Sequence, residues 1–149
     1  MKLEEVIKQK EFKSPLYKAI LNIRVTESWL SNQVNQTLKP FGLSQEQYNV
    51  LRILNGQYPN PSPLQLISER MVNRMSNATR LVEKLRQNGL VTRQECPSNR
   101  RKVDILITQK GIDLLQEIRP QLDATMDNMN SLDAAEAEQL NYLLDKFRG

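Results

Sequence analysis

Histidine is absent from this 149-residue sequence, and cysteine occurs once, as Cys96. Histidine is the commonest general base and metal ligand near neutral pH, and one thiol cannot build a cysteine metal site. We therefore predict that the protein is not an enzyme and that it holds no metal ion and no cofactor. A single cysteine also excludes an internal disulfide, which is typical of proteins in a reducing compartment.

Long apolar segments are absent too. No segment approaches the roughly 18 consecutive apolar residues that a membrane-spanning helix needs, and residues 1–12 alternate between charged and apolar residues, unlike a secretory signal. We therefore expect a soluble, cytoplasmic protein. The five glycines and seven prolines form no biased tract or repeat, so the composition predicts one folded unit over residues 1–149.

Positive charge is concentrated in the middle of the chain. Residues 70–110 contain ten Lys or Arg and three acidic residues, a net charge of +7, whereas the whole chain carries +4 and residues 111–149 carry −5. A basic segment within an otherwise slightly acidic chain is typical of a surface that binds phosphate groups. A charged face that contacts only water would give the same count, so charge alone does not decide between the two.

Capping residues and apolar spacing predict two helices in the first third of the chain. Ser14–Pro15 is typical of a helix start, and apolar residues at helical spacing follow until the chain reaches residues 40–42. Ser44 and Gln47 form a capping box, which predicts a second helix that ends at Asn55–Gly56.

The last third of the chain is also predicted to be helical. Thr108 is typical of the cap of a long helix that Pro120 kinks or breaks, and residues 133–136 form a capping box for a final helix. The apolar faces of these terminal helices need a partner. We therefore expect residues 14–39 and 109–148 to form a helical dimerisation region that packs within and between two subunits.

The middle of the chain predicts a helix-turn-helix. Ser62–Gln65, with proline at the second position, is typical of a capping box and predicts a short helix over 63–71. A second helix is predicted over 74–88, with Gly89 as its cap. Its apolar residues fall on one side at helical spacing, and we expect them to be buried: Met75, Ala78, Leu81, Val82 and Leu85. Two helices joined by so few residues form a helix-turn-helix unit.

A β-hairpin follows this unit. Residues 90–94 and 103–107 favour strands, and residues 95–102 between them form a basic, turn-rich loop. We call this hairpin the wing. The predicted fold is mainly α with a small β-hairpin wing: a winged helix-turn-helix over 44–107, flanked by N- and C-terminal dimerisation helices.

The outer side of the predicted helix 74–88 is polar, and a helix of this kind fits the major groove of DNA. Asn pairs with adenine, Arg pairs with guanine, and hydroxyls bond base edges or phosphates. We predict duplex contacts from Arg74, Ser76, Asn77, Thr79, Arg80 and Lys84. At the wing we predict contacts to phosphates or an adjacent minor groove from Arg100, Arg101 and Lys102.

Several of these segments together resemble the MarR family of transcriptional regulators. They are Ile67–Met71, Arg74–Leu85, Asn88–Val91, Asn99–Arg101, and Ile107–Thr108 with Gly111. The resemblance implies a repressor that is an obligate homodimer held by its first, fifth and sixth helices, and whose two lobes bind half-sites of a pseudo-palindromic operator. It also implies a small ligand or oxidant that releases the DNA. The family usually has wing aspartates where this chain has Cys96 and Asn99, so the resemblance leaves the role of Arg101 open.

Other interpretations of the same residues stay open. Cys96 lies near Arg93 and Arg100 in sequence, and positive charge makes a thiol more reactive, so a redox-sensing regulator is one alternative. A winged helix that binds another protein is a second alternative, because fold does not fix function. Trp29 either lines an effector cleft between the dimer helices and the DNA-binding lobe or packs in the core or the dimer interface.

Overall fold

The computed structural model describes the backbone of residues 1–96, 99–129 and 131–149, and the side chains of these residues except 95, 96 and 99–102. It is mainly helical with one small antiparallel sheet, so the predicted fold class is confirmed. The elements follow in the order α1 (Leu3–Val6), α2 (Pro15–Leu38), the 3₁₀ turn η1 (Lys39–Phe41), α3 (Gln45–Asn55), β1 (Ser62–Pro63), α4 (Leu64–Arg70), α5 (Ala78–Gln87), β2 (Val91–Cys96), β3 (Asn99–Ile107), α6 (Gln109–Met129) and α7 (Ala134–Arg148).

Most helix starts lie where the capping residues predict them. The Ser14 hydroxyl accepts a hydrogen bond from the Tyr17 N–H at 3.1 Å, and a reciprocal capping box joins Ser44 and Gln47. A second reciprocal box at residues 133–136 begins α7. These local hydrogen bonds satisfy N–H groups that a helix start otherwise leaves unpaired, so sequence alone locates them.

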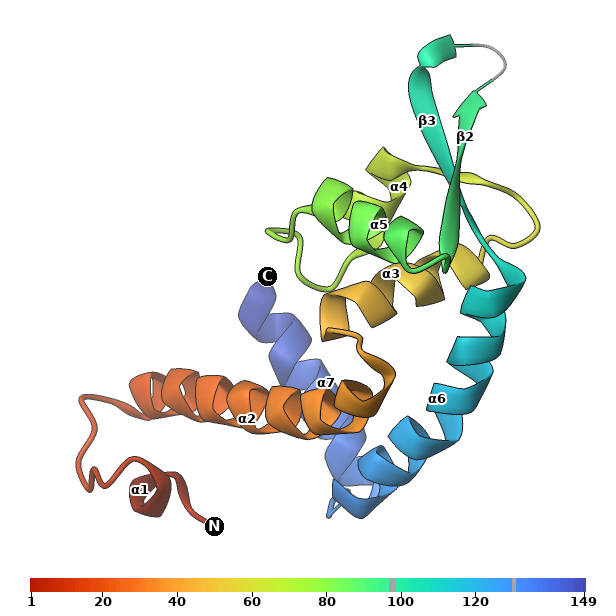
Figure 1. Cartoon of the computed structure of the whole chain (residues 1–149). Coiled ribbons are helices and arrows are strands. Elements are labelled where there is room, and N and C mark those ends of the chain that lie inside the picture. Colours follow the sequence, from red (N-terminus) through yellow and green to blue (C-terminus); the bar gives the residue numbers. More distant parts are fainter. Residues whose placement is uncertain (97–98, 130) are drawn as a thin grey trace.

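The core lies in the lobe formed by α3, α4, α5 and the sheet. The side chains that are almost fully buried there are aliphatic: Val50, Leu51, Leu54, Ile67, Val82, Leu85, Val91, Ile105 and Ile107. Burial of each such side chain stabilises the fold by about 1.5–3 kcal/mol relative to exposure. In Figure 1 the β2–β3 hairpin extends from one end of the molecule, whereas α2 and α7 lie toward the other end and α6 joins the two.

The predicted capping box at residues 62–65 is wrong. Ser62 and Pro63 form strand β1, which pairs with Ile105 and Asp104 of β3 in a sheet of order β1-β3-β2. Ser62 is 2% exposed, and α4 begins one residue later without a side-chain cap. Pairing with a strand about forty residues away therefore prevails over the local capping preference, as tertiary contacts do for short elements.

The helix predicted over 74–88, which we call the recognition helix, is shorter than predicted. Residues 74–77 are not helical, with a turn at 74 and 75, and α5 begins at Ala78, where the Asn77 carboxamide oxygen accepts the Arg80 N–H at 3.0 Å. Met75, which the spacing places on the buried side, is 93% exposed. Asparagine favours such caps over helix interiors, and Asn73 repeats the pattern with the Met75 N–H.

The wing strands are longer than predicted, and α6 is not interrupted. Most of the predicted loop 95–102 belongs to the strands, because β2 extends to Cys96 and β3 begins at Asn99. The pairing register of the two strands is irregular between Glu95 and Cys96. Helix α6 passes through Pro120 without a break. No helix in the described part of the chain combines the length and the hydropathy that crossing a lipid bilayer requires.

Candidate nucleic-acid interface

Helix α5 presents a buried side and a polar side. Ala78, Val82 and Leu85 face the core with at most 5% of their surface exposed. Thr79, Arg80 and Lys84 are exposed on the other side. The apolar side of α5 packs against α3 and β2, so the polar side points away from the lobe. This polar side can therefore contact an extended ligand such as a DNA duplex.

Two shallow hollows flank the polar side of α5. One, of about 330 Å³, is lined by Glu46, Ser76, Asn77, Arg80, Leu81 and Lys84. The other, of about 660 Å³, is lined by Asn77, Thr79, Arg80, Glu83, Lys84 and Gln87. Arg80 and Lys84 line both hollows, so their side chains form the ridge between them. We call the polar lining residues of α5 and of the two positions before it the α5 ridge: Ser76, Asn77, Thr79, Arg80, Glu83, Lys84 and Gln87.

The structure brings five of the six predicted recognition residues together on this ridge, and Arg74 lies apart in the preceding turn. Four lining residues lie outside the predicted contact set: Glu46, Leu81, Glu83 and Gln87. Gln87 follows Glu83 and Lys84 at helical spacing, so the periodicity could have revealed it. Glu46 comes from α3, and no local signal in the sequence points to it.

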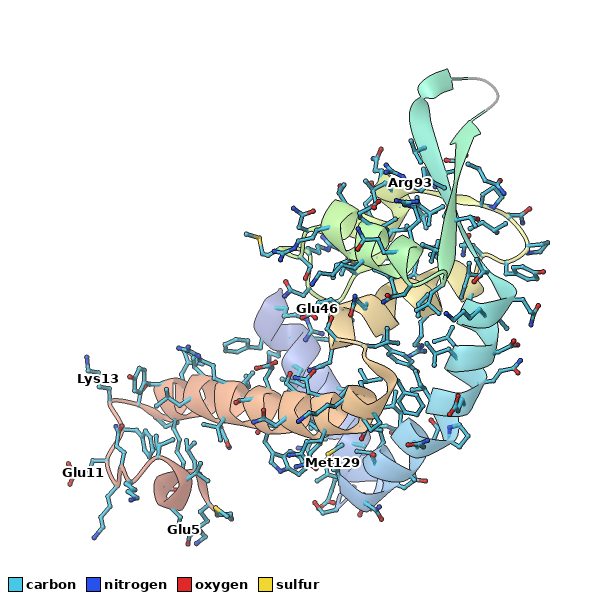
Figure 2. All side chains as sticks on the ribbon, in the orientation of Figure 1. Glu5, Glu11, Lys13, Glu46, Arg93 and Met129 are labelled. Carbon is cyan, nitrogen blue, oxygen red and sulfur yellow. The ribbon has the colours of Figure 1, made fainter. Side chains whose placement is uncertain are left out.

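Glu83 connects the recognition helix to the wing. Its carboxylate accepts two hydrogen bonds from the Arg86 guanidinium, at 2.8 and 3.0 Å, and lies 3.8 Å from the Arg93 guanidinium of β2. The hydrogen bond from Arg86 is the main reason why the pKa of Glu83 lies below its usual value. Figure 2 shows Arg93 at the hairpin and Glu46 at the start of α3.

Comparison with known proteins identifies the family. The model of the MarR family matches residues 43–103. The HTH-type transcriptional regulator MhqR of Bacillus subtilis (strain 168) is 31% identical over 118 residues, which cover 78% of this chain and 80% of MhqR. The chain belongs to the MarR family. Its members are transcriptional regulators with a winged-helix DNA-binding fold.

Solved structures of MarR-type regulators share the fold. CouR from Rhodococcus jostii RHA1, bound to p-coumaroyl-CoA, superposes with a TM-score of 0.73 at 21% identity and covers 91% of this chain and 95% of its own. BpsR of Bordetella bronchiseptica, whose DNA binding is regulated by 6-hydroxynicotinic acid, gives 0.71 at 23% identity and covers 85% and 96%. At these identities the likeness shows the fold alone.

Near the tip of the wing of this MarR-family chain, at residues 95, 96 and 99–102, the structure describes the backbone but not the side chains. Arg100, Arg101 and Lys102 belong to β3, and Cys96 ends β2, but their side chains lie outside the described residues. The predicted wing contacts therefore stay predictions, and the choice between a redox-sensing Cys96 and a thiol with no role in regulation stays open.

Proposed function

We propose that this MarR-family regulator acts in the cytoplasm as a homodimeric repressor that binds a pseudo-palindromic DNA operator through the α5 ridge. The observation that carries the proposal is the exposed polar side of α5 beside a basic hairpin, on a lobe whose apolar side is buried. An α-helix of this kind fits the major groove, where Asn and Arg distinguish base pairs. The proposed base or phosphate contacts are Arg74, Ser76, Asn77, Thr79, Arg80 and Lys84, with Arg100, Arg101 and Lys102 on phosphates or in a minor groove.

Exposed apolar faces on the terminal helices support the dimer. Helix α7 has no buried residue, although Leu140, Leu143 and Phe147 recur on one of its faces at about half exposure. On α2, the exposed residues Leu16, Ile20, Ile23 and Leu30 follow the same helical spacing. A helix with an exposed apolar stripe is typical of one that packs on a partner. We therefore propose 44–107 as the DNA-binding lobe and 14–39 with 109–148 as the dimerisation region.

Two-fold symmetry fixes the spacing of the operator. Two recognition helices on one face of a dimer enter successive major grooves, so half-sites lie about 10 bp apart, centre to centre. We further propose that a small molecule releases this regulator from DNA; the DNA binding of BpsR is regulated by such a molecule, 6-hydroxynicotinic acid.

The decisive test of the ridge is Arg80→Ala on a duplex selected from a random pool. We expect the specific affinity to fall roughly 5- to 150-fold, because one bidentate contact to a base contributes about 1–3 kcal/mol of discrimination, while affinity for random duplex falls less. Lys10→Ala, which removes an exposed cation from the segment before α2, serves as the control and should change neither. Titration by fluorescence anisotropy measures both affinities. Failure to bind any duplex at low ionic strength would contradict the proposed function itself.

Glu83→Gln tests whether the link between α5 and β2 orients the cations. We expect affinity for random duplex to rise and the ratio of specific to random affinity to fall a few-fold, because the variant removes repulsion with phosphates and releases Arg86 and Arg93. The slope of log K against log salt should steepen by about one charge. Glu138→Gln on α7 removes the same charge elsewhere and should leave the ratio unchanged. An unchanged ratio for Glu83→Gln as well would mean that this carboxylate orients nothing.

A further inference from the structure

After Met1, the two most exposed large apolar side chains in the described part of the chain lie directly before α5. Val72 is 92% exposed and Met75 is 93% exposed. Both belong to the connection between α4 and α5, which is anchored in the core by Met71 at one end and by Ala78 at the other. In Figure 1 this connection projects from the lobe on the side away from α6. We call Val72 and Met75 the apolar pair.

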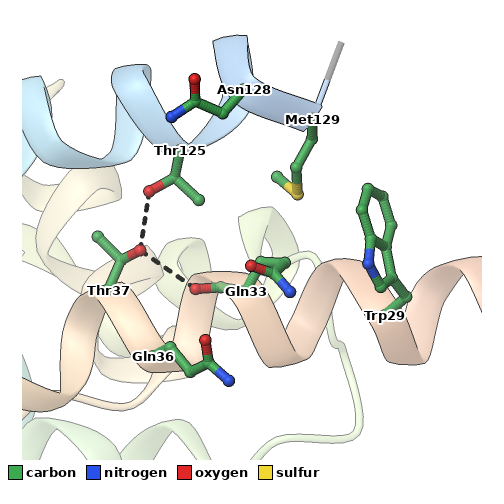
Figure 3. A pocket seen from close by; sticks show the side chains of 7 residues that line it. All are labelled: Trp29, Gln33, Gln36, Thr37, Thr125, Asn128 and Met129. Atoms are coloured by element: carbon green, nitrogen blue, oxygen red, sulfur yellow. Dashed lines mark hydrogen bonds between the residues drawn. The ribbon is translucent and has the colours of Figure 1, made fainter. Parts of the chain in front are cut away.

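Other exposed apolar side chains are covered more extensively by their own chain. Trp29, which is 45% exposed, rises from α2 toward a pocket of about 470 Å³ whose lining residues all belong to α2 and α6. Figure 3 shows Met129 of α6 pointing into the same pocket. Leu140 and Leu143 on the apolar stripe of α7 are also about half exposed. The apolar pair, with less than a tenth of its surface buried, differs from all of these.

Hydrogen bonds hold the backbone of this connection in place. The Asn49 carboxamide oxygen of α3 accepts the Val72 N–H at 3.0 Å, and the Asn73 carboxamide oxygen accepts the Met75 N–H at 3.1 Å. The Ser76 N–H donates to the Asn73 carbonyl, also at 3.1 Å. Because the backbone is bonded at several points, little further ordering is needed when a ligand covers the apolar pair.

The surroundings of the apolar pair favour an anionic partner. Residues 70–80 include three arginines and no acidic residue. Ser76 and Asn77 follow Met75 directly and line one of the hollows beside the α5 ridge. The apolar pair is therefore continuous with the surface that we propose to contact a duplex. A phosphate backbone pairs with these cations, whereas an apolar protein face would cover them without supplying an opposite charge.

The major groove offers one kind of apolar group to such side chains. Its base edges present hydrogen-bond donors and acceptors, together with the C5 methyl group of thymine. In a helix-turn-helix the residues at the N-terminal end of the second helix contact these edges, and the apolar pair lies directly before that end of α5. An apolar side chain at this place gains most from a thymine methyl group, because it cannot satisfy the donors and acceptors.

We propose that the apolar pair recognises thymine, by packing on thymine methyl groups in the major groove beside the bases that the α5 ridge contacts. This inference rests on the proposed function and adds to it a second kind of base recognition. Asn77 and Arg80 distinguish base pairs by hydrogen bonds, whereas the apolar pair distinguishes thymine by a methyl group that no other unmodified base carries. The flexible side chain of Met75 adapts to the position of that methyl group, and the branched side chain of Val72 is stiffer.

Uracil in place of thymine tests the contact, because it removes the methyl group and keeps every hydrogen bond of the base pair. In an operator selected from a random pool, each thymine is replaced in turn by deoxyuridine, and fluorescence anisotropy gives the affinity of the full-length protein. We expect one or two positions in each half-site to weaken binding by about threefold to fivefold, as for the loss of one buried methyl group. An operator in which no thymine responds would overturn the proposal.

Variants of the protein assign the responding thymines to the apolar pair. In Val72→Ala or Met75→Ala, we expect deoxyuridine at the responding position to cost nothing further, because the partner of the methyl group is already gone. Val6→Ala truncates an exposed apolar side chain of α1, outside the lobe and the dimerisation region, and should respond to deoxyuridine as the wild type does. All three variants should keep the wild-type Tm, since the truncated side chains are exposed. The same response to deoxyuridine in all four proteins would overturn the proposal.

The same titrations distinguish this inference from the proposed function. High operator affinity with an equal response to deoxyuridine in every variant refutes only the role of the apolar pair, whereas a wild type that binds no duplex refutes the proposed function. Light scattering excludes a protein partner of the same sequence. A lower molar mass for Val72→Ala or Met75→Ala would place the apolar pair in a contact between two copies and would overturn the inference.

Discussion

Replacing Leu143 with glutamate is expected to convert the protein from dimer to monomer and to reduce operator affinity by about a hundredfold or more. Leu143 is 51% exposed and lies on the apolar stripe of α7, and that helix buries no residue within the chain. A carboxylate on this stripe would have to be buried unpaired in the proposed dimer, which is far more costly than burial of leucine. The monomer then loses the second half-site, whose effective concentration contributes about 10²–10⁴ to avidity.

The measurements are the molar mass by light scattering and the affinity for a selected operator duplex. Asn141→Glu is the matched control, because it adds the same charge to an exposed position of α7 off the stripe. We expect this variant to stay dimeric and to bind normally. If Leu143→Glu were also dimeric with full operator affinity, the dimerisation region would have to lie elsewhere.

Local hydrogen bonding decides which helix boundaries the sequence predicts correctly. Ser44, Ser14 and Asp133 cap their helices as expected, because each cap is completed by residues only three positions away. Ser62 has the same local pattern, yet it becomes a strand because β3 supplies a pairing edge. Asn77 competes with the predicted start of the recognition helix at Arg74, and the capping preference of asparagine prevails over the apolar spacing of Met75.

The residues of the candidate interface also differ in how well the sequence predicts them. Arg80 and Lys84 are predictable because they lie opposite a clear apolar stripe of one helix. The sequence does not predict the position of Glu46 or the contact between Glu83 and Arg93, because each depends on how two elements pack together. The pocket between α2 and α6 likewise joins residues almost ninety positions apart. Sequence periodicity describes single elements, whereas these features exist only between elements.

The structure explains why glycine occupies position 111, one of the positions that carry the resemblance to the MarR family. It lies in the first turn of α6, where its N–H donates to the Thr108 hydroxyl at 3.2 Å. A methyl group on its α-carbon would lie 2.5 Å from the Leu90 carbonyl oxygen and 2.8 Å from a side-chain carbon of Ile107. Only glycine allows α6 to approach the base of the wing this closely, since the nearer obstacle is backbone.

We therefore expect Gly111→Ala to lower the free energy of unfolding by about 3 kcal/mol, at the upper end of the usual cost of overpacking, because backbone has to move. In a chain of this length that corresponds to a fall in Tm of about 6–12 °C, which calorimetry measures. Gly56→Ala is the matched control, since its added carbon meets nothing closer than 3.5 Å and its φ of −68° suits alanine. That variant should be unchanged or more stable by up to about 1 kcal/mol. Equal melting temperatures for the two variants would show that α6 can move away from the wing base at little cost, and that the close approach at Gly111 does not determine how α6 is joined to the DNA-binding lobe.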